Sequence, residues 1–425
     1  MVKAVNFFVV TVLFLLVTYV VDQTIREPIA VGSSSSWTTI LTPLNPFLVL
    51  ESLLHPTGYA TPESSRLGWP IGWLVTHPVA GWVWITIIGS LTIITWSSLQ
   101  VRKLGDRGVK ESLWKRLTKY GEQHREPHAV SGNPIAWRER VTRHRNIGSL
   151  LGSWGFVSVF GLTFIILATL FFTRTLSGDV FRDITQYLVV AELLIVTFFA
   201  ISLSASSIAK EREDGSLDLL LTTSITPKMY LGGKMRGLVM HLLPMVLVPC
   251  VTMMTMGILV LLNPEHAVVT DVWSQTSQMP TATPLALYLP ALVFPVSFIP
   301  YISFCMVLGL LWSMRSKGTI GAIITTLILV FILTAGLGVC LVPVQGIPIL
   351  GTGLSSLSPF SLMFAILSPA NSLPSVLEDG ARATNIRLGV TTVIAGVVWT
   401  GLCFGLLRSM SASFVTTVRR LAGIS

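Results

Sequence analysis

The chain has 425 residues, of which 52% are hydrophobic and 12% are charged. Its mean hydropathy of +0.72 would leave a soluble fold with too little polar surface, so the composition excludes that class and predicts an integral membrane protein. The formal net charge of +9 is explained by basic residues that face anionic lipid headgroups, so no nucleic-acid partner is required.

Eight apolar segments are long enough to form membrane-spanning helices, which need about 20 mostly apolar residues each. They lie at roughly residues 4–21, 81–100, 150–173, 187–207, 237–262, 285–313, 319–342 and 388–407. None shows the alternation of apolar and polar residues that is typical of a membrane β-barrel. We therefore expect an all-α integral membrane protein with about eight transmembrane helices, the first of which is retained rather than cleaved as a signal peptide.

The distribution of lysine and arginine predicts the orientation of these helices, because cytoplasmic connections carry an excess of both residues. Residues 101–149 contain twelve of them and residues 208–236 contain five, whereas residues 263–284 contain none. Both basic connections are therefore expected to be cytoplasmic. Because eight helices alternate in direction, both termini are then expected to be cytoplasmic.

Residues 1–100 hold two predicted spans, a large external loop and a segment that recurs near the end of the chain. Residues 44–56 and 357–369 share five identities in thirteen positions, and each includes an apolar run too short to cross a bilayer. Residues 1–100 can therefore be a partial repeat of the last two spans, but two unrelated anchoring helices explain them equally well. Residues 101–132 are interpreted as a basic cytoplasmic linker, and residues 133–425 as a domain with six spans.

The segment from 208 to 236 separates two apolar runs and has the residue order of a turn, a short helix and a second helix start. A charged run that includes Glu211 and Glu213 meets Gly215, which allows a sharp change of direction. Thr226 and Pro227 are typical of the cap and first residue of the next helix. A short helix is predicted between Gly215 and Thr226. Ser216 can cap it, and Asp218 lies in its first turn, where a negative charge suits the helix dipole. Its apolar face consists of Leu217, Leu220 and Leu221.

These residues resemble the cytoplasmic segment of ABC-2 type transporter permeases. The matching positions are Glu211, Glu213, Gly215, Ser216, Leu217, Asp218, Leu220, Leu221, Thr222, Thr223, Ile225, Thr226, Gly233 and Lys234. A second segment resembles the basic amphipathic elbow helix that precedes the first span of the family, and it comprises Asn133, Pro134, Ile135, Ala136, Trp137, Arg138, Glu139 and Arg140. Together with the order of the apolar segments, the resemblance covers roughly residues 133–425.

The resemblance implies the membrane-spanning permease subunit of an ATP-driven exporter in the plasma (inner) membrane. Cytoplasmic ATPase subunits that hold ATP and Mg²⁺ would dock on the segment from Glu211 to Ile225, and a second permease copy or a paralogue would complete the pathway. The sequence has no phosphate-binding loop, so we expect no cofactor and no catalytic site on this chain. Two alternatives stay open: a scaffold that docks an ATPase without moving a substrate, and a secondary transporter. The sequence does not indicate the transported substrate.

Some residues inside the predicted spans are candidates for the pathway or for hinges. Glu192 is expected about five residues into its span, near the outer face, where it is functional, snorkels to the interface, or pairs with Arg174 or Arg182. Prolines interrupt or kink helices but are also common in membrane helices, so a hinge role is one of two explanations for Pro244, Pro249, Pro290, Pro295 and Pro300. No metal site is expected, and the four cysteines are predicted to be packing residues without disulfides.

Overall fold

The computed structural model describes residues 36–55, 59–60, 71–105, 133–144, 147–174, 177–215, 226–262, 268–271, 281–316, 318–344, 347–373 and 380–421, together with Thr11, Phe14, Leu15, Thr18, Tyr19 and Asp22. The chain divides into two compact units, one that lies within residues 10–129 and one that includes residues 130–425. The division falls inside the segment predicted to be a linker, most of which lies outside the described residues.

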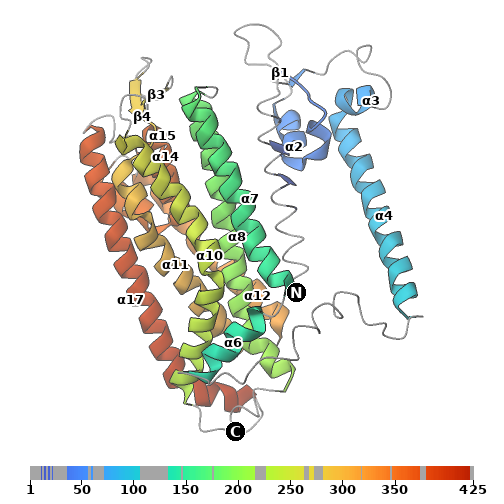
Figure 1. Cartoon of the computed structure of the whole chain (residues 1–425), viewed down its shortest axis with the longest axis vertical. Helices are drawn as coiled ribbons and strands as arrows, with labels where there is room; N and C mark the ends of the chain where they lie inside the picture. Colours follow the sequence, from blue (N-terminus) through green and yellow to red (C-terminus); the bar gives the residue numbers. More distant parts are fainter. Residues whose placement is uncertain are drawn as a thin grey trace, which may run out of the picture. The chain divides into compact units, whose positions relative to one another are not determined.

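The larger unit contains six long helices (Figure 1). They are α7 (Ile147–Phe172), α8 (Gly178–Glu213), α10 (Pro227–Leu262), α11 (Tyr288–Arg315), α12 (Thr319–Leu341) and α17 (Ala381–Leu421). Each is long and apolar enough to cross a membrane, and each overlaps one of the six spans predicted for residues 133–425. A seventh such helix belongs to the smaller unit, and the first predicted span, 4–21, lies mostly outside the described residues. The all-α, multi-pass membrane fold is thus confirmed.

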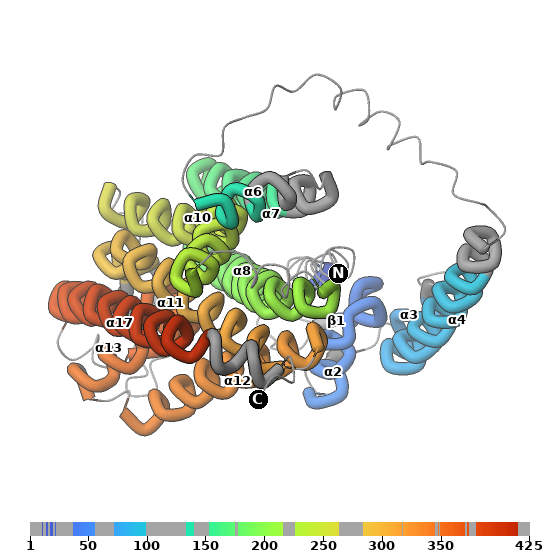
Figure 2. Tube along the Cα trace, turned by 90° about the horizontal axis from the view of Figure 1, so that it is seen from below, coloured from blue at the N-terminus to red at the C-terminus, as the bar shows by residue number. Residues whose placement is uncertain are grey.

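Helix α8 occupies a central position in the larger unit, because it contacts α7, α10, α11 and α12. Figure 2, which looks towards the ends of the helices, shows α8 among these neighbours. In their apolar stretches, most residues of α8, α10 and α11 are buried, whereas only a minority of those of α7, α12 and α17 are. In a membrane the exposed apolar faces suit contact with lipid.

Helices α8 and α10 extend beyond the apolar segments from which they were predicted. The expected span at 187–207 is the middle of α8, which has 36 residues and is therefore about 54 Å long. A bilayer core is only about 30 Å thick, so the ends of α8 can carry charges outside it. Asp179 lies in its first turn, and Lys210 and Arg212 lie in its last, where each charge suits the helix dipole.

The prolines do not interrupt the helices that contain them. Helix α10 continues through Pro244 and Pro249, and α11 continues through Pro295 and Pro300. Pro290 is the third residue of α11, where the backbone N–H has no acceptor within the helix in any case. The expected interruption of these two spans is therefore wrong, since packed neighbouring helices tolerate the lost hydrogen bonds. A hinge role for the five prolines stays a prediction.

Short elements connect the long helices of the larger unit. Strands β3 (Val268–Asp271) and β4 (Thr281–Pro284) form an antiparallel hairpin between α10 and α11. After α12 come η3 (Val342–Val344), α13 (Pro348–Leu357), α14 (Pro359–Leu367) and α15 (Pro369–Ser372). Helix α14 packs on α8 and α11, where the backbone N–H of Leu287 donates to the carbonyl of Ile366 at 3.0 Å. These helices of ten residues or fewer are too short to span a bilayer, as predicted for residues 357–369.

The smaller unit is built around the long apolar helix α4 (Pro78–Gly105). Its other elements are β1 (Ser36–Trp37), η1 (Thr42–Leu44), α2 (Pro46–Leu54), β2 (Tyr59–Ala60) and α3 (Ile71–Thr76), and β1 pairs with β2 in parallel. The buried side chain of Asn45 accepts the N–H of Phe47 at 2.9 Å, which caps α2. Its amide group also donates to the carbonyl of Leu15 at 2.7 Å and to Thr18 at 2.9 Å.

The two segments with similar sequences form similar helices. Helices α2 and α14 each have nine residues, begin with proline and follow an extended cap residue, Asn45 or Ser358, with φ/ψ of −117°/118° and −101°/124°. They also end alike, since His55 and Ser368 have φ/ψ of −123°/64° and −129°/64°. The shared geometry agrees with a partial repeat, although a common origin of the two segments stays a prediction.

Candidate functional site: a buried ion cluster beside the connecting segment

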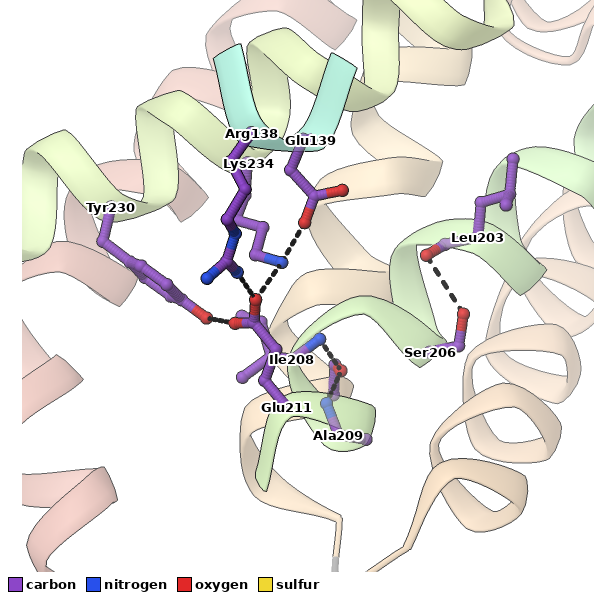
Figure 3. Close-up of polar contacts among 10 residues, drawn as sticks. Arg138, Glu139, Leu203, Ser206, Ile208, Ala209, Glu211, Tyr230 and Lys234 are labelled. Carbon is purple, nitrogen blue, oxygen red and sulfur yellow. Dashed lines mark hydrogen bonds and ion pairs between the residues drawn. The ribbon is translucent and has the colours of Figure 1, made fainter. Parts of the chain in front are cut away.

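Five polar side chains from three helices meet at the end of α8 (Figure 3). Arg138 and Glu139 come from α6 (Pro134–His144), Glu211 comes from α8, and Tyr230 and Lys234 come from α10. The ammonium group of Lys234 donates to Glu211 at 2.8 Å and also to Glu139. Arg138 donates to the same oxygen of Glu211, and the Tyr230 hydroxyl donates to its other oxygen at 2.5 Å. We call these five residues the Glu211 cluster.

The Glu211 cluster contains two cations and two carboxylates, so its formal charge is zero. Lys234 is only 1% exposed, whereas 46% of the Arg138 side chain is exposed. A buried ammonium group is very unfavourable unless opposite charges and hydrogen bonds compensate it, and Glu139 and Glu211 provide both. Removing one partner of such a buried pair costs about 3–5 kcal/mol. The three helices are therefore held together at this point by ion pairs whose separation would cost a large free energy.

Helix α6 is the predicted elbow helix, and it lies directly on α10. Pro134 is its first residue, and the side chain of Asn133 accepts the N–H of Ile135 at 3.0 Å. The amide group of Asn133 also donates to the carbonyl of Met229 at 2.7 Å, which fixes the start of α6 to the first turn of α10. The two helices approach closely because Gly237 has no side chain: a Cβ there would lie 2.6 Å from the Cβ of Glu139.

The remaining residues predicted for the elbow helix do not all contribute to this contact. Trp137 is 41% exposed, so its indole ring is available to another surface. Arg138 and Glu139 join the Glu211 cluster, whereas the side chain of Arg140 lies outside the described part of the structure. The helix itself is confirmed, with Ile135 on its buried face.

The docking residues predicted at the end of α8 point in different directions. Glu211 is buried in the cluster, whereas Glu213 is exposed and accepts the backbone N–H of Thr319 at 2.7 Å. Gly215 has a φ of +68°, which a residue with a side chain rarely adopts, and this confirms the predicted sharp turn. Outside the described residues lie Leu217, Asp218, Leu220, Leu221, Thr222 and Ile225. The predicted short helix at 216–225 is therefore not described.

The start of α10 agrees with the sequence. Pro227 is its first residue, and the hydroxyl group of Thr226 accepts the N–H of Met229 at 3.3 Å. Thus α8 ends at Glu213 and α10 begins at Pro227, with the undescribed residues 216–225 between two helix ends that share the Glu211 cluster.

Glu192 lies near the middle of α8, fourteen residues after Gly178, because α8 starts nine residues before the apolar segment from which it was predicted. Its side chain is fully buried between helices, so the expected snorkelling is wrong. Its position near the outer face of the membrane stays a prediction. One carboxyl oxygen of Glu192 accepts a hydrogen bond from Thr252 of α10 at 3.3 Å. Arg182, an expected partner, lies 3.6 Å from Asp183.

Lys234 and Tyr230 were not predicted as site residues. Lys234 was recognised only as one of the positions that resemble the ABC-2 permease segment. The available signal was a lysine at the eighth position of a helix that continues into a long apolar stretch, since buried lysines require a counter-charge. Among the described residues no group of three or more histidine, cysteine, aspartate or glutamate side chains could hold a metal ion. The four cysteines lie within the described helices and are unpaired there.

The cluster can hold the ends of the three helices together and transmit displacement between them. Its ionised groups already satisfy one another within the chain. In comparisons with known proteins, neither a model of a known protein family nor a curated protein matches the sequence.

Proposed function

We propose that this chain is the membrane-spanning permease subunit of an ATP-driven exporter of the ABC-2 type in the plasma (inner) membrane. The observation that carries the proposal is the Glu211 cluster, which joins α6, α8 and α10 immediately beside residues 216–225. A segment that receives force from a soluble partner needs such a stiff connection to the helices that it moves. An anchoring loop between two helices would need no buried ion cluster at its base.

In this proposal a cytoplasmic ATPase subunit that holds ATP and Mg²⁺ docks on residues 211–225. Movement of the ATPase displaces the end of α8 and the start of α10 together, because Lys234 of α10 is paired with Glu211 of α8. Helix α6 follows, because Glu139 pairs with the same lysine. Separating Lys234 from both carboxylates would leave its buried ammonium group without a counter-charge, so the three helices respond as one body.

The turn after α8 supports the same interpretation. Gly215 ends the helix with a positive φ, and its N–H donates to the carbonyl of Arg212 at 3.0 Å. The chain therefore leaves α8 in a fixed direction, and the ten residues that follow are bounded at their far side by the Thr226 cap of α10. A short connection with both ends fixed transmits displacement better than a loop with free ends.

The test is purification of the full chain from its native membrane in a mild detergent, followed by assays of ATP hydrolysis and transport. We expect an ATPase to copurify and the chain alone to hydrolyse no ATP. Replacing Leu217 and Leu221 by aspartate should remove the ATPase at unchanged membrane levels, whereas Lys228→Gln, at an exposed position in the first turn of α10, should retain it. Hydrolysis by the chain alone, or equal copurification in all variants, would overturn the proposal. An ATPase that binds without any transport would favour the scaffold.

A second candidate, ion-coupled transport by this chain alone, is favoured by one observation. Glu192 is a carboxyl group buried among membrane helices, and such residues frequently mark ion or proton pathways. It has only the Thr252 hydroxyl as a described hydrogen-bond partner, and one of its oxygens has none among the described residues. Transport by the purified chain that depends on an ion gradient, and not on ATP, would select this candidate.

A further inference from the structure

The last two turns of α8 contact a second part of the larger unit, the turn between α11 and α12. The Ser313 hydroxyl accepts the backbone N–H groups of Ile208 at 3.1 Å and Ala209 at 2.8 Å. One turn further along α8, Arg212 donates to the backbone carbonyls of Met314, at 3.4 Å, and Ser316. Glu213 then accepts the backbone N–H of Thr319, as described above.

The charges of Arg212 and Glu213 match the two helix ends that they contact. Helix α11 ends at Arg315, so the carbonyl groups near that end lack partners within the helix and attract a cation. Helix α12 begins at Thr319 after Gly318, which has no side chain to cap it. The carboxylate of Glu213 takes the place of that missing cap, and a negative charge suits the start of a helix.

The contact face of α8 with this turn differs from its contact face with the Glu211 cluster. Successive residues of a helix are about 100° apart, so Glu211 and Glu213 point to nearly opposite sides. Glu211 faces α6 and α10, whereas Arg212 and Glu213 reach the ends of α11 and α12. The final turn of α8 thus stands between two sets of helices and is bonded to both.

Close packing prevents α11 from sliding along α8 at this level. A Cβ at Gly309 of α11 would lie 2.0 Å from the hydroxyl oxygen of Ser204 and 3.0 Å from the backbone nitrogen of Ala205. Helix α12 has most of its side chains exposed and contacts α8, α11 and α13. Its position therefore depends on the end of α8 and on the turn that Arg212 and Glu213 cap.

We infer that Arg212 and Glu213 are positioning residues that carry displacement of the 216–225 segment to α11 and α12. The inference rests on the proposed function. It adds α11 and α12 to the helices α6 and α10, which are connected to α8 through Glu211. It also assigns Glu213 a role within the chain, as the cap of α12. Movement of the segment then acts on both sides of α8 at once.

Hydrogen–deuterium exchange of the full chain in lipid nanodiscs tests the contact itself. In Glu213→Ala the amide of Thr319 loses its acceptor, so exchange in peptides covering residues 314–324 should be faster, on the order of five-fold at that amide. Glu213→Gln retains an oxygen acceptor and should exchange like the wild type. Asp214→Ala, at the next exposed position, is the matched control and should also be unchanged. Equal exchange in Glu213→Ala and Asp214→Ala would overturn the inference.

The same measurement on the complex with the copurified ATPase tests the transmission of movement. Addition of a non-hydrolysable ATP analogue with Mg²⁺ should change exchange in residues 227–237 and 314–324 of the wild type. In the double variant Arg212→Ala/Glu213→Ala, only the change in residues 227–237 should persist. If both changes persist, or if residues 314–324 never respond in the wild type, the inference is wrong. A lack of any ATPase would contradict the proposed function, while the exchange comparison of the chain alone would still decide whether Glu213 caps α12.

Discussion

Replacing Gly237 by alanine is a direct test of the contact between α6 and α10. The added Cβ would lie 2.6 Å from the Cβ of Glu139. Carbon atoms in contact are normally about 3.5–4.0 Å apart, so the two helices must separate by about 1 Å at this point. No change of rotamer can relieve the overlap, because both atoms are fixed by their backbones. The separation also pulls Glu139 away from Lys234.

Gly232, in the same helix and before Gly237, provides a matched control, since a Cβ there would meet no atom within 4 Å. Alanine favours a helix over glycine by about 1 kcal/mol, and both variants gain that amount. Overpacking of a tight contact costs about 1–3 kcal/mol, and only Gly237→Ala should incur it. We therefore expect Gly237→Ala to be about 1–3 kcal/mol less stable than Gly232→Ala.

Thermal unfolding of the purified full chain, followed with a thiol-reactive dye, measures this difference. Cys250 and Cys305 are buried and would react only on unfolding, and the other two cysteines, Cys340 and Cys403, can be replaced by serine in every variant. Gly232→Ala should unfold at or above the midpoint of the parent, and Gly237→Ala should unfold below it. Equal midpoints would refute the reasoning that α6 is seated on Gly237.

Three further predictions concern the charged cluster, the turn after α8 and the buried carboxyl. Lys234→Met should lower the stability by about 3 kcal/mol or more in the same thermal assay, because the buried carboxylates of Glu139 and Glu211 lose their shared counter-charge. Adding Glu139→Gln should restore part of the loss, because it removes one of these two negative charges. Gly215→Val should impair transport at normal membrane levels, since the φ of +68° at this position disfavours a branched side chain. Gly215→Asn should transport normally, because asparagine tolerates a positive φ. Equal transport by both variants would contradict the prediction. Glu192→Gln, which conserves shape and its Thr252 contact, should leave the thermal midpoint nearly unchanged but abolish any ion-dependent transport.

The sequence was sufficient to predict the order of the six long helices described within residues 133–425, because each span is an apolar run that no soluble fold would tolerate. It also predicted the turn at Gly215 and the start of α10 at Pro227, since local turn and capping chemistry decides both. The helix at residues 133–140 was expected from the resemblance to the elbow helix. Hydropathy did not reveal how far α8 extends, because its first and last turns are polar and lie beyond the apolar layer.

The contacts that define the site depend on residues far apart in the chain, which explains why only part of the site was predicted. Glu211 and Glu213 are two positions apart and were assigned one docking role, yet the helix turns them to opposite faces. The partner of Glu213 is a backbone N–H group at residue 319, which no sequence motif marks. Lys234 was visible as a charge in a helix that is mostly apolar, but its two carboxylate partners could be identified only from the packing of α6 and α8 on α10.

The central claim is that residues 216–225 receive force from an ATPase, and site-specific photo-cross-linking tests it most directly. A photoreactive amino acid placed at Asp218 in the full chain, activated in intact cells, should capture a protein whose sequence contains a phosphate-binding loop, G-x-x-x-x-G-K-[ST]. The same amino acid at Ser277, in the connection without lysine or arginine, should capture no such protein. Capture of a phosphate-loop protein from Asp218 alone is the predicted result. Failure of Asp218 to capture one, with the chain at normal membrane levels, would contradict the account.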